Sequence, residues 1–322
     1  MSRSGSSESH VWDSIEVIAL AFAVSAGSCG AATLDGNGAE PIIVTSDVDR
    51  FYEVYDEAEG RPTAGMLQRK YLDPGSSGLH ELARLRNVTG QSIAEAIARR
   101  PDIYVEARDC VEVLPRVRKR LEVSLRKLKN LYPETRVPPI TVAVGRGKPV
   151  GIGGRASGVQ IGAEALCATD WINPDIEDRF VRVIMHEYAH VQQAVAFSES
   201  GNATVLSASL EEGAAEFLTE LTTGAVSYSY MGDLVAGREK QIETEFAADA
   251  EKTDLSDWLY NSTPEKPADL GYWVGYRIVK SYYRNAADKR EAIRDILEMR
   301  NPGEFLARSG WRPGVPLEAG VE

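Results

Sequence analysis

The spacing of apolar residues along the chain is mostly helical, and it predicts helices in both halves. These predicted helices cover residues 47–58, 92–99, 111–133, 175–197, 207–223 and 288–299. Pro115 is tolerated in the third of them because it falls in the first turn, where its missing N–H is not needed. Gly224 is expected to end the fifth, since glycine adopts the left-handed conformation that closes many helices. The pattern therefore favours a largely helical protein.

A short central stretch differs from these helical segments. Residues 140–144 (ITVAV) form a β-branched run, residues 145–154 are rich in glycine, and residues 158–161 (GVQI) are typical of a second short strand. A small sheet is therefore expected next to the helix at 175–197. One hypothesis is that 158–161 forms a sheet edge along which an extended peptide adds, and a purely structural strand is the alternative. The expected fold class is α+β, mostly helical.

The first residues of the chain have the order of an export signal. Residues 17–24 (VIALAFAV) are an apolar run too short to span a bilayer, and the residues after it, 25–32, are mostly small. Acidic residues before the run depart from the positive charge that such signals carry. Residues 26–29 (AGSC) resemble the box of a bacterial lipoprotein, with alanine where leucine is usual, so a lipid on Cys29 would hold the protein at a membrane. The alternative is that the run is a buried element of a cytosolic protein.

This interpretation divides the chain into three parts. They are a signal peptide or lipoprotein signal over 1–32, a linker over 33–40, and a single catalytic domain over 41–322. The domain would consist of a helical part, 41–139, and a part containing the candidate metal site, 140–322. An export signal implies an exported protein in the periplasm or cell envelope.

Charge excludes one class of partner. The chain has 48 acidic and 36 basic residues, which gives a formal net charge of -12. The electrostatic field of a protein with this negative charge repels phosphate groups, so nucleic acid is not an expected partner. The basic residues between 116 and 129 alternate with apolar ones at helical spacing, and we interpret them as the solvated face of an amphipathic helix.

The cysteines give no support to a thiolate metal site. Only three are present, and none of them forms a C-x-x-C pair. If Cys29 carried a lipid, Cys110 and Cys167 would remain as an even pair that could bridge in an oxidising compartment. Two isolated buried thiols are the alternative.

The candidate chemistry lies in the helix predicted over 175–197. Residues 186–190 read HEYAH, and two histidines four residues apart share one helix face. Imidazoles at this spacing can supply two of the three protein ligands of a catalytic zinc ion, Zn²⁺. Glu187 between them would then take a proton from zinc-bound water and pass it to the leaving group. Ordinary hydrogen-bonded core histidines are the alternative, but the chain has only four histidines and two are here.

A third ligand is offered by the next helix. Residues 210–218 read LEEGAAEFL, about twenty residues beyond His190, so a loop can fold this helix back antiparallel beside the first. Glu212 would complete a set of two histidines and one glutamate. Glu216, one turn later, would accept a hydrogen bond from the other nitrogen of a ligand histidine. Gly213 is unfavourable inside a helix, and its presence is then explained if two backbones approach closely around the ion.

Two other interpretations of these glutamates stay open. Ser209 and Glu212 have the spacing of a capping box, in which the glutamate only satisfies an amide at the helix start. Glu211 is a further candidate for the third ligand.

The combination of HEYAH with EEGAAEF at 211–217 resembles the gluzincin metallopeptidases, which include thermolysin and aminopeptidase N. With GYWVGYRIV at 271–279, it is similar to a bacterial family of predicted zinc-dependent proteases related to gliding-motility lipoproteins. The resemblance covers residues 41 to about 300. It implies a zincin-like metalloprotease fold, His186, His190 and Glu212 as zinc ligands, Glu187 as catalytic base, Glu216 in support, and an exported, lipid-anchored protein.

The same resemblance implies a group that stabilises the oxyanion of the tetrahedral intermediate. No histidine follows His190, so a tyrosine must serve, and Tyr276 is the first choice, followed by Tyr272. The alternative is that these aromatics form the core face of a helix. Arg277 is a candidate for binding a substrate carboxylate. No Gly-x-Met-x-Asn motif precedes the helix predicted over 175–197, so the resemblance does not extend to the amine-binding site of aminopeptidase N.

The sequence thus predicts a zinc-dependent peptidase acting on a peptide or protein substrate. An envelope-anchored assembly or scaffold protein with a zincin fold and little or no catalysis is the second hypothesis. A cytosolic metallohydrolase acting on a small amide is the third.

Overall fold

The computed structural model describes residues 41–263 and 266–317 of the 322-residue chain. The predicted signal and linker, with the lipidation site at Cys29, lie outside the described residues. Within the part that is described, no helix is long and apolar enough to cross a membrane.

The described chain is built mainly from helices, with one small sheet. The helices are α1 (Ser46–Glu57), α2 (Ala64–Met66), α3 (Ser77–Arg86), α4 (Gly90–Arg99), α5 (Pro101–Cys110), α6 (Leu114–Leu131), α7 (Ala163–Cys167), α8 (Ile176–Gln192), α9 (Val205–Thr223), α10 (Met231–Val235), α11 (Glu239–Asp249), α12 (Leu270–Asn285), α13 (Lys289–Leu297) and α14 (Pro302–Ser309). The strands are β1 (Ile43–Val44), β2 (Ile140–Ala143), β3 (Gly151–Gly154) and β4 (Gly158–Gly162). A π-helical turn, Leu67–Leu72, follows α2, and a short 3-10 turn, Val111–Val113, precedes α6. The prediction of a mostly helical α+β fold is confirmed.

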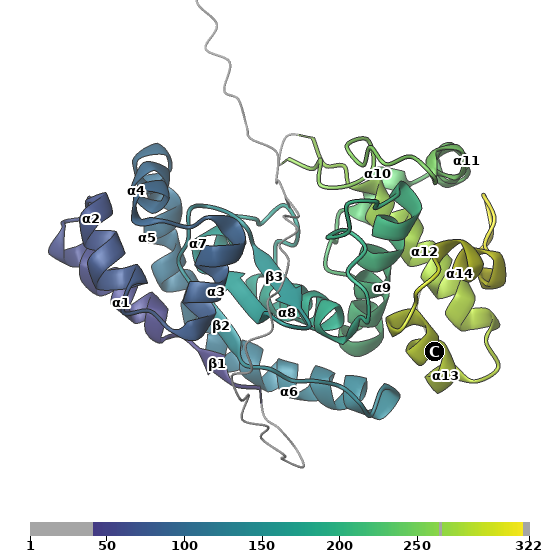
Figure 1. The fold of residues 1–322 in the computed structure, drawn as a ribbon, viewed down its shortest axis with the longest axis horizontal. Helices are drawn as coiled ribbons and strands as arrows, with labels where there is room; N and C mark the ends of the chain where they lie inside the picture. The colour runs from purple at the N-terminus through teal and green to yellow at the C-terminus, as the bar shows by residue number, and fades with distance from the viewer. Residues whose placement is uncertain (1–40, 264–265, 318–322) are drawn as a thin grey trace, which may run out of the picture.

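The sheet and α8 form the centre of the molecule. In Figure 1, α1 to α5 lie at one end and α10 to α14 at the other, with the sheet and α8 between them. Helix α8 packs against β3 and β4 on one side and against α9 on another. The residues that α8 carries are therefore placed where the two ends of the molecule meet.

The strand order is β1-β2-β4-β3, with β1, β2 and β4 parallel and β3 antiparallel to β4. Strand β4 pairs on both sides, so the hypothesis that residues 158–161 form a sheet edge is wrong. The edge strands are β1 and β3. Strand β3 has the sequence GIGG, in which Ile152 is the one β-branched residue among glycines, so its composition does not identify it as a strand. Of these two edge strands, β3 lies against α8.

The structure shifts the end of α8 and the start of α9 from their predicted positions. Helix α8 ends at Gln192 instead of residue 197, because Gln193 leaves the helical conformation and the Ala194 N–H donates to the Leu297 carbonyl. Helix α9 begins at Val205, where Thr204 and Ser207 form the capping box. The capping-box interpretation of Ser209 and Glu212 is therefore wrong, since both lie inside the helix.

The basic segment of α6 behaves as an amphipathic helix. Val117, Leu121, Leu125 and Leu128 are buried, whereas Arg116 and Arg120 on the other face pair with Glu177 and Asp178 in the first turn of α8. Cys110 at the end of α5 forms a disulfide with Cys167 at the end of α7, with their Cα atoms 6.1 Å apart. Of the two interpretations of these cysteines, the bridged pair is the one found.

Helices α9 and α12 pack with their backbones in contact at two glycines. A Cβ atom placed on Gly213 would lie 2.1 Å from the backbone carbonyl carbon of Gly275, and one on Gly275 would lie 1.7 Å from the Ser209 carbonyl oxygen. Gly213 is thus explained by close approach to α12, not by packing around an ion. The contact fixes how α9 is seated, and with it every side chain that α9 presents on its other face.

We predict that Gly213→Ala destabilises the fold. The added methyl has no room between the two backbones, so the free energy of unfolding should fall by about 3 kcal/mol, as for a strongly overpacked core. Denaturant unfolding followed by circular dichroism measures this. Gly232→Ala in α10 is the matched control, because nothing lies within 4 Å of the new methyl and alanine favours a helix. Equal stability of the two variants would contradict the prediction.

Candidate metal centre

Helix α8 brings the two histidines together on one face. Asp175 caps the helix by accepting a hydrogen bond from the Asp178 N–H, and Phe180 and Ile184 are fully buried beneath it. Four residues of helix then place the Nε2 atoms of His186 and His190 3.1 Å apart. Both side chains are largely buried, so water cannot satisfy these nitrogens freely.

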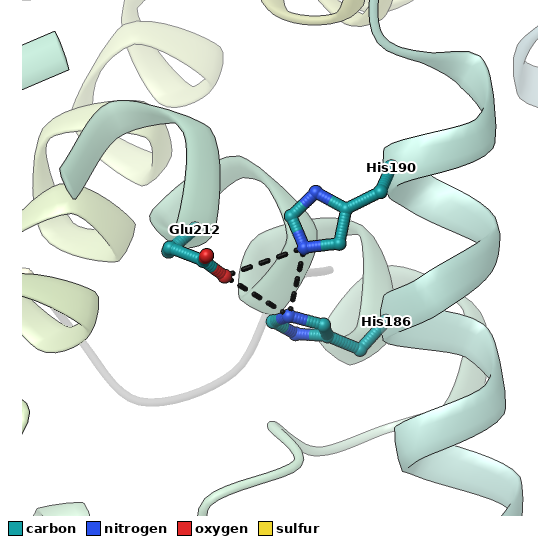
Figure 2. Close-up of side chains that lie close together, drawn as sticks. All are labelled: His186, His190 and Glu212. Carbon is teal, nitrogen blue, oxygen red and sulfur yellow. Dashed lines mark hydrogen bonds and ion pairs between the residues drawn. The ribbon is translucent and has the colours of Figure 1, made fainter. Parts of the chain in front are cut away.

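Helix α9 supplies the third group from the opposite side. Glu212 Oε2 lies 3.2 Å from His186 Nε2 and 3.3 Å from His190 Nε2, as Figure 2 shows. The two helices run in opposite directions. The earlier residue of α8, His186, contacts the later residue of α9, Glu216, whereas Gln193 at the end of α8 contacts Glu211. The predicted antiparallel arrangement of the two helices is therefore confirmed.

The three atoms fit a tetrahedral metal ion. Their separations of 3.1, 3.2 and 3.3 Å form a nearly equilateral triangle. Zinc bonds of about 2.0–2.1 Å in tetrahedral geometry would separate neighbouring ligands by roughly 3.4 Å. In the described part of the chain, His186, His190 and Glu212 form a group able to hold a metal. Two imidazoles and one carboxylate are the donor set of a catalytic zinc site, which leaves a fourth position open.

Further hydrogen bonds orient both imidazoles. His186 Nδ1 lies 2.8 Å from Glu216 Oε1, and His190 Nδ1 lies 2.7 Å from Gln193 Oε1. Because both partners are oxygen acceptors, each Nδ1 carries a proton, and a neutral imidazole held in this way has its lone pair on Nε2, where a metal would bind. The backbone N–H of Ser227 donates to Glu216 Oε2 and the Ser227 hydroxyl donates to Oε1, so that carboxylate is itself held. The support predicted for Glu216 is present in the structure.

Tyr260 is a contact that the sequence did not reveal. Its hydroxyl donates to Glu212 Oε1 at 2.9 Å, and so it holds the carboxylate oxygen that faces away from the histidines. The residue lies in an irregular segment before α12 and has a positive φ of 59°, a conformation that is uncommon outside glycine. No periodicity marks such a position, and only the folded loop brings it to the site.

The aromatic residues of α12 separate into two groups. The ring of Tyr272 stacks on His186, with centroids 6.2 Å apart. The Tyr276 hydroxyl instead donates to Glu220 at 2.9 Å and accepts from Lys280 at 2.6 Å. The structure therefore does not bring Tyr276 to the histidines, because its hydroxyl is bound in a separate buried ion pair between α9 and α12.

Two other candidate site residues, Arg277 and Glu211, form their contacts with other parts of the protein. Arg277 donates through Nε to buried Glu243 at 2.5 Å and through Nη2 to the Val315 carbonyl, so it braces the C-terminal segment. Glu211 accepts a hydrogen bond from the Ser198 N–H at 2.7 Å and thus faces the loop after α8. Burial raises the pKa of Glu211 to about 7 although nearby His190 opposes the shift. The geometry favours Glu212 over Glu211 as the third ligand.

Glu187 lies between the histidines and the edge strand. A Cβ atom on Gly151 would fall 2.5 Å from Glu187 Oε1, and one on Gly153 would fall 2.0 Å from the Glu187 carbonyl oxygen. The glycines of β3 therefore let the strand lie directly on α8 at this residue. Burial raises the pKa of Glu187, while the neighbouring histidines and Arg86 act in the opposite direction. Such an environment increases the basicity of a carboxylate.

The pKa values of the candidate ligands depend strongly on one another. Burial opposes the charged form of His186, but hydrogen bonds to Glu212 and Glu216 outweigh it and raise the pKa of His186 well above its usual range. Burial raises the pKa of Glu212, yet the two histidines reverse the effect and lower it overall. The carboxylate is therefore ionised, and without a metal it is balanced by protons on the imidazoles.

Comparison with known proteins gives one match. Residues 154–300 match the model of a family described as "Predicted Zn-dependent protease (DUF2268)". This segment contains α8, α9 and α12, and thus the two histidines and Glu212. No curated protein and no solved structure matches the chain. The match supports this family, zinc as the metal, and a metalloprotease as the broad class of the protein.

We predict that Glu212→Ala abolishes zinc binding. Removing one of three protein ligands from a site of this kind removes most of its affinity. Purified protein should contain about one zinc per chain by elemental analysis, and the variant almost none. Glu211→Gln is the neighbouring control and should keep its zinc. The reverse result, with zinc lost only in the Glu211 variant, would assign the ligand to Glu211.

Zinc affinity should also depend on pH. In the metal-free protein, burial lowers the pKa of His190, but Glu212 outweighs it and raises the pKa to about 9. Zinc binds only the neutral imidazole, so it must displace a proton that is held at every pH below this value. The apparent affinity should therefore rise as the pH is raised from neutral toward about 9, measured by competition with a chelator. An affinity that does not change with pH would contradict this.

Proposed function

We propose that the protein is a zinc-dependent peptidase of the gluzincin type, with a zincin-like arrangement around α8 and α9. The proposal rests on one observation above all, the triangle of His186, His190 and Glu212 with Glu187 beside it on the same helix. The family match to predicted zinc-dependent proteases supports the same class.

The metal would be held by the two Nε2 atoms and by Glu212 Oε2. Bound there, Zn²⁺ would supply Lewis acidity, which lowers the pKa of water and polarises a carbonyl group. Glu187 would act as general base, taking a proton from the attacking water and delivering it to the leaving amine. Its raised pKa suits both steps, because a stronger base accepts the proton more readily and its conjugate acid still donates it.

The edge strand β3 would bind the substrate backbone. Strand β4 pairs with one side of β3, and among the described residues no strand pairs with the other side. An extended peptide can add there through backbone hydrogen bonds. Because β3 is in direct contact with α8 at Glu187, a peptide on this edge would run close to the base. We assign no role in this mechanism to Tyr276, whose hydroxyl is bound to Glu220 and Lys280.

We also propose that the protein acts after export, in the periplasm or cell envelope. The disulfide between Cys110 and Cys167 fits an oxidising compartment, and it weighs against a cytosolic amidase. Attachment to a membrane through a lipid on Cys29 is part of the proposal and can be tested by cell fractionation of wild type against Cys29→Ser.

We predict that Glu187→Gln keeps its zinc and loses peptidase activity. The amide cannot accept the proton of water, so hydrolysis of a mixed library of internally quenched peptides should fall by about a hundredfold or more. Glu177→Gln, in the first turn of the same helix, is the control and should keep both zinc and activity.

Full activity of Glu187→Gln would reject the mechanism. Wild-type protein that contains zinc but cleaves none of the peptides would instead favour an assembly or scaffold role in the envelope.

A further inference from the structure

Arg86 is held at the end of α3 by a contact with the loop that follows β2. The next residue, Asn87, adopts the left-handed conformation with φ of 49° and ends the helix. The Arg146 Nε–H donates to the Arg86 carbonyl oxygen at 3.1 Å. Arg86 is therefore anchored through its backbone carbonyl, and its side chain takes no part in this contact.

The guanidinium of Arg86 has donors that the fold does not use. Its Nε atom is buried and has no hydrogen-bond partner within the described residues. Its Nη1 atom reaches the Leu85 carbonyl only at 3.4 Å, near the limit of a hydrogen bond. A buried donor without a partner is costly, so this group is one that a ligand would satisfy.

Three other arginines with little exposure have partners in the fold. Arg182 is paired with Asp178, although its Nε also lacks a hydrogen-bond partner among the described residues. Arg179 donates from Nε to the Asn173 carbonyl and from Nη1 to the carbonyls of Leu166 and Cys167. Arg277 forms an ion pair with Glu243. All three have structural roles that their contacts explain, whereas Arg86 forms no ion pair in the part of the chain that is described.

The surroundings of Arg86 are those of the candidate active site. Burial lowers the pKa of Arg86 and so does nearby Arg146, while the charges of Glu187 and Glu199 and the phenol of Tyr260 act in the opposite direction. These groups come from α8, from the loop after it and from the segment that contacts Glu212. Arginine stays charged in such a setting, so Arg86 places positive charge near the proposed base in a protein whose net charge is -12.

We propose that Arg86 binds a carboxylate group of the peptide substrate, and that the protein therefore selects anionic peptides. The proposal rests on the proposed peptidase function for the place of the substrate. A guanidinium presents parallel N–H donors in a planar fork that matches a carboxylate, and a peptide offers this group in two ways. One is its free C-terminus, and the other is the side chain of an aspartate or glutamate near the cleaved bond.

A binding experiment separates substrate selection from catalysis. Zinc-loaded Glu187→Gln protein, which should hold peptides without cleaving them, is titrated by calorimetry with four N-acetylated tetrapeptides. Two are tetra-alanine with a free C-terminus and its amide, and two are amides with an internal glutamate or glutamine. We expect one carboxylate peptide to bind about tenfold or more tightly than its neutral partner, as for a charge-assisted pair. Which pair shows the difference identifies the source of the carboxylate.

Adding Arg86→Gln should remove this difference and leave the affinity of the neutral peptides unchanged. Adding Arg84→Gln is the control, because Arg84 lies on the same helix but is exposed and already paired with Glu81. Arg86→Lys keeps the charge and loses the fork, so it should keep only part of the preference, and it decides the test if the glutamine variant fails to fold.

Three results would overturn the proposal. They are equal binding of charged and neutral peptides before Arg86 is changed, a preference that survives Arg86→Gln or is fully kept by Arg86→Lys, and a loss that is the same for all four peptides. The last would mean that Arg86 only positions Glu187. The titration needs no turnover, so a protein that cleaves nothing would reject the proposed function and still give a result for Arg86.

Discussion

The structure around the candidate site depends on the pairing of α8 with α9. Two buried imidazole nitrogens 3.1 Å apart are unfavourable neighbours unless something lies between or beside them, and Glu212 supplies the balancing charge. The carboxylate can do so only if α9 is seated at one height against α8. That height is fixed by the next residue of α9, Gly213, which meets the backbone of α12. The arrangement of the three candidate ligands is therefore set by a helix contact in which none of them takes part.

Glycine has the same function on the other side of the site. In β3 the glycines Gly151 and Gly153 let the strand lie on α8 at Glu187, so the proposed base is enclosed between a helix and a sheet edge. Close approach of backbones excludes water and lowers the local dielectric, which is what raises the pKa of this carboxylate. The arrangement and the acid–base property thus have one cause, which is that two segments of backbone touch where side chains would have kept them apart.

Segments far apart in the sequence complete the site. Ser227 after α9 holds Glu216, and Tyr260 in an irregular segment holds Glu212. Arg86, a hundred residues before His186, contributes charge to the same region and is anchored by the loop after β2. Two helices hold the candidate ligands, while loops adjust their orientation and charge. This division is common in enzymes, where rigid elements position reactive groups and loops adapt the site to a substrate.

The sequence by itself determined the mostly helical class and two of the central strands, and it singled out His186, Glu187, His190, Glu212 and Glu216 as the candidate set. It could do so because helical periodicity is a local property that fixes which side chains share a face. The tertiary structure decided what depends on contact between distant segments. It made β3 and not β4 the sheet edge, placed Gly213 against α12, turned Tyr276 toward Glu220 and brought Tyr260 to Glu212. Spacing along a chain says nothing of which backbones will touch or which hydroxyl finds which carboxylate, because those outcomes are set by packing in three dimensions.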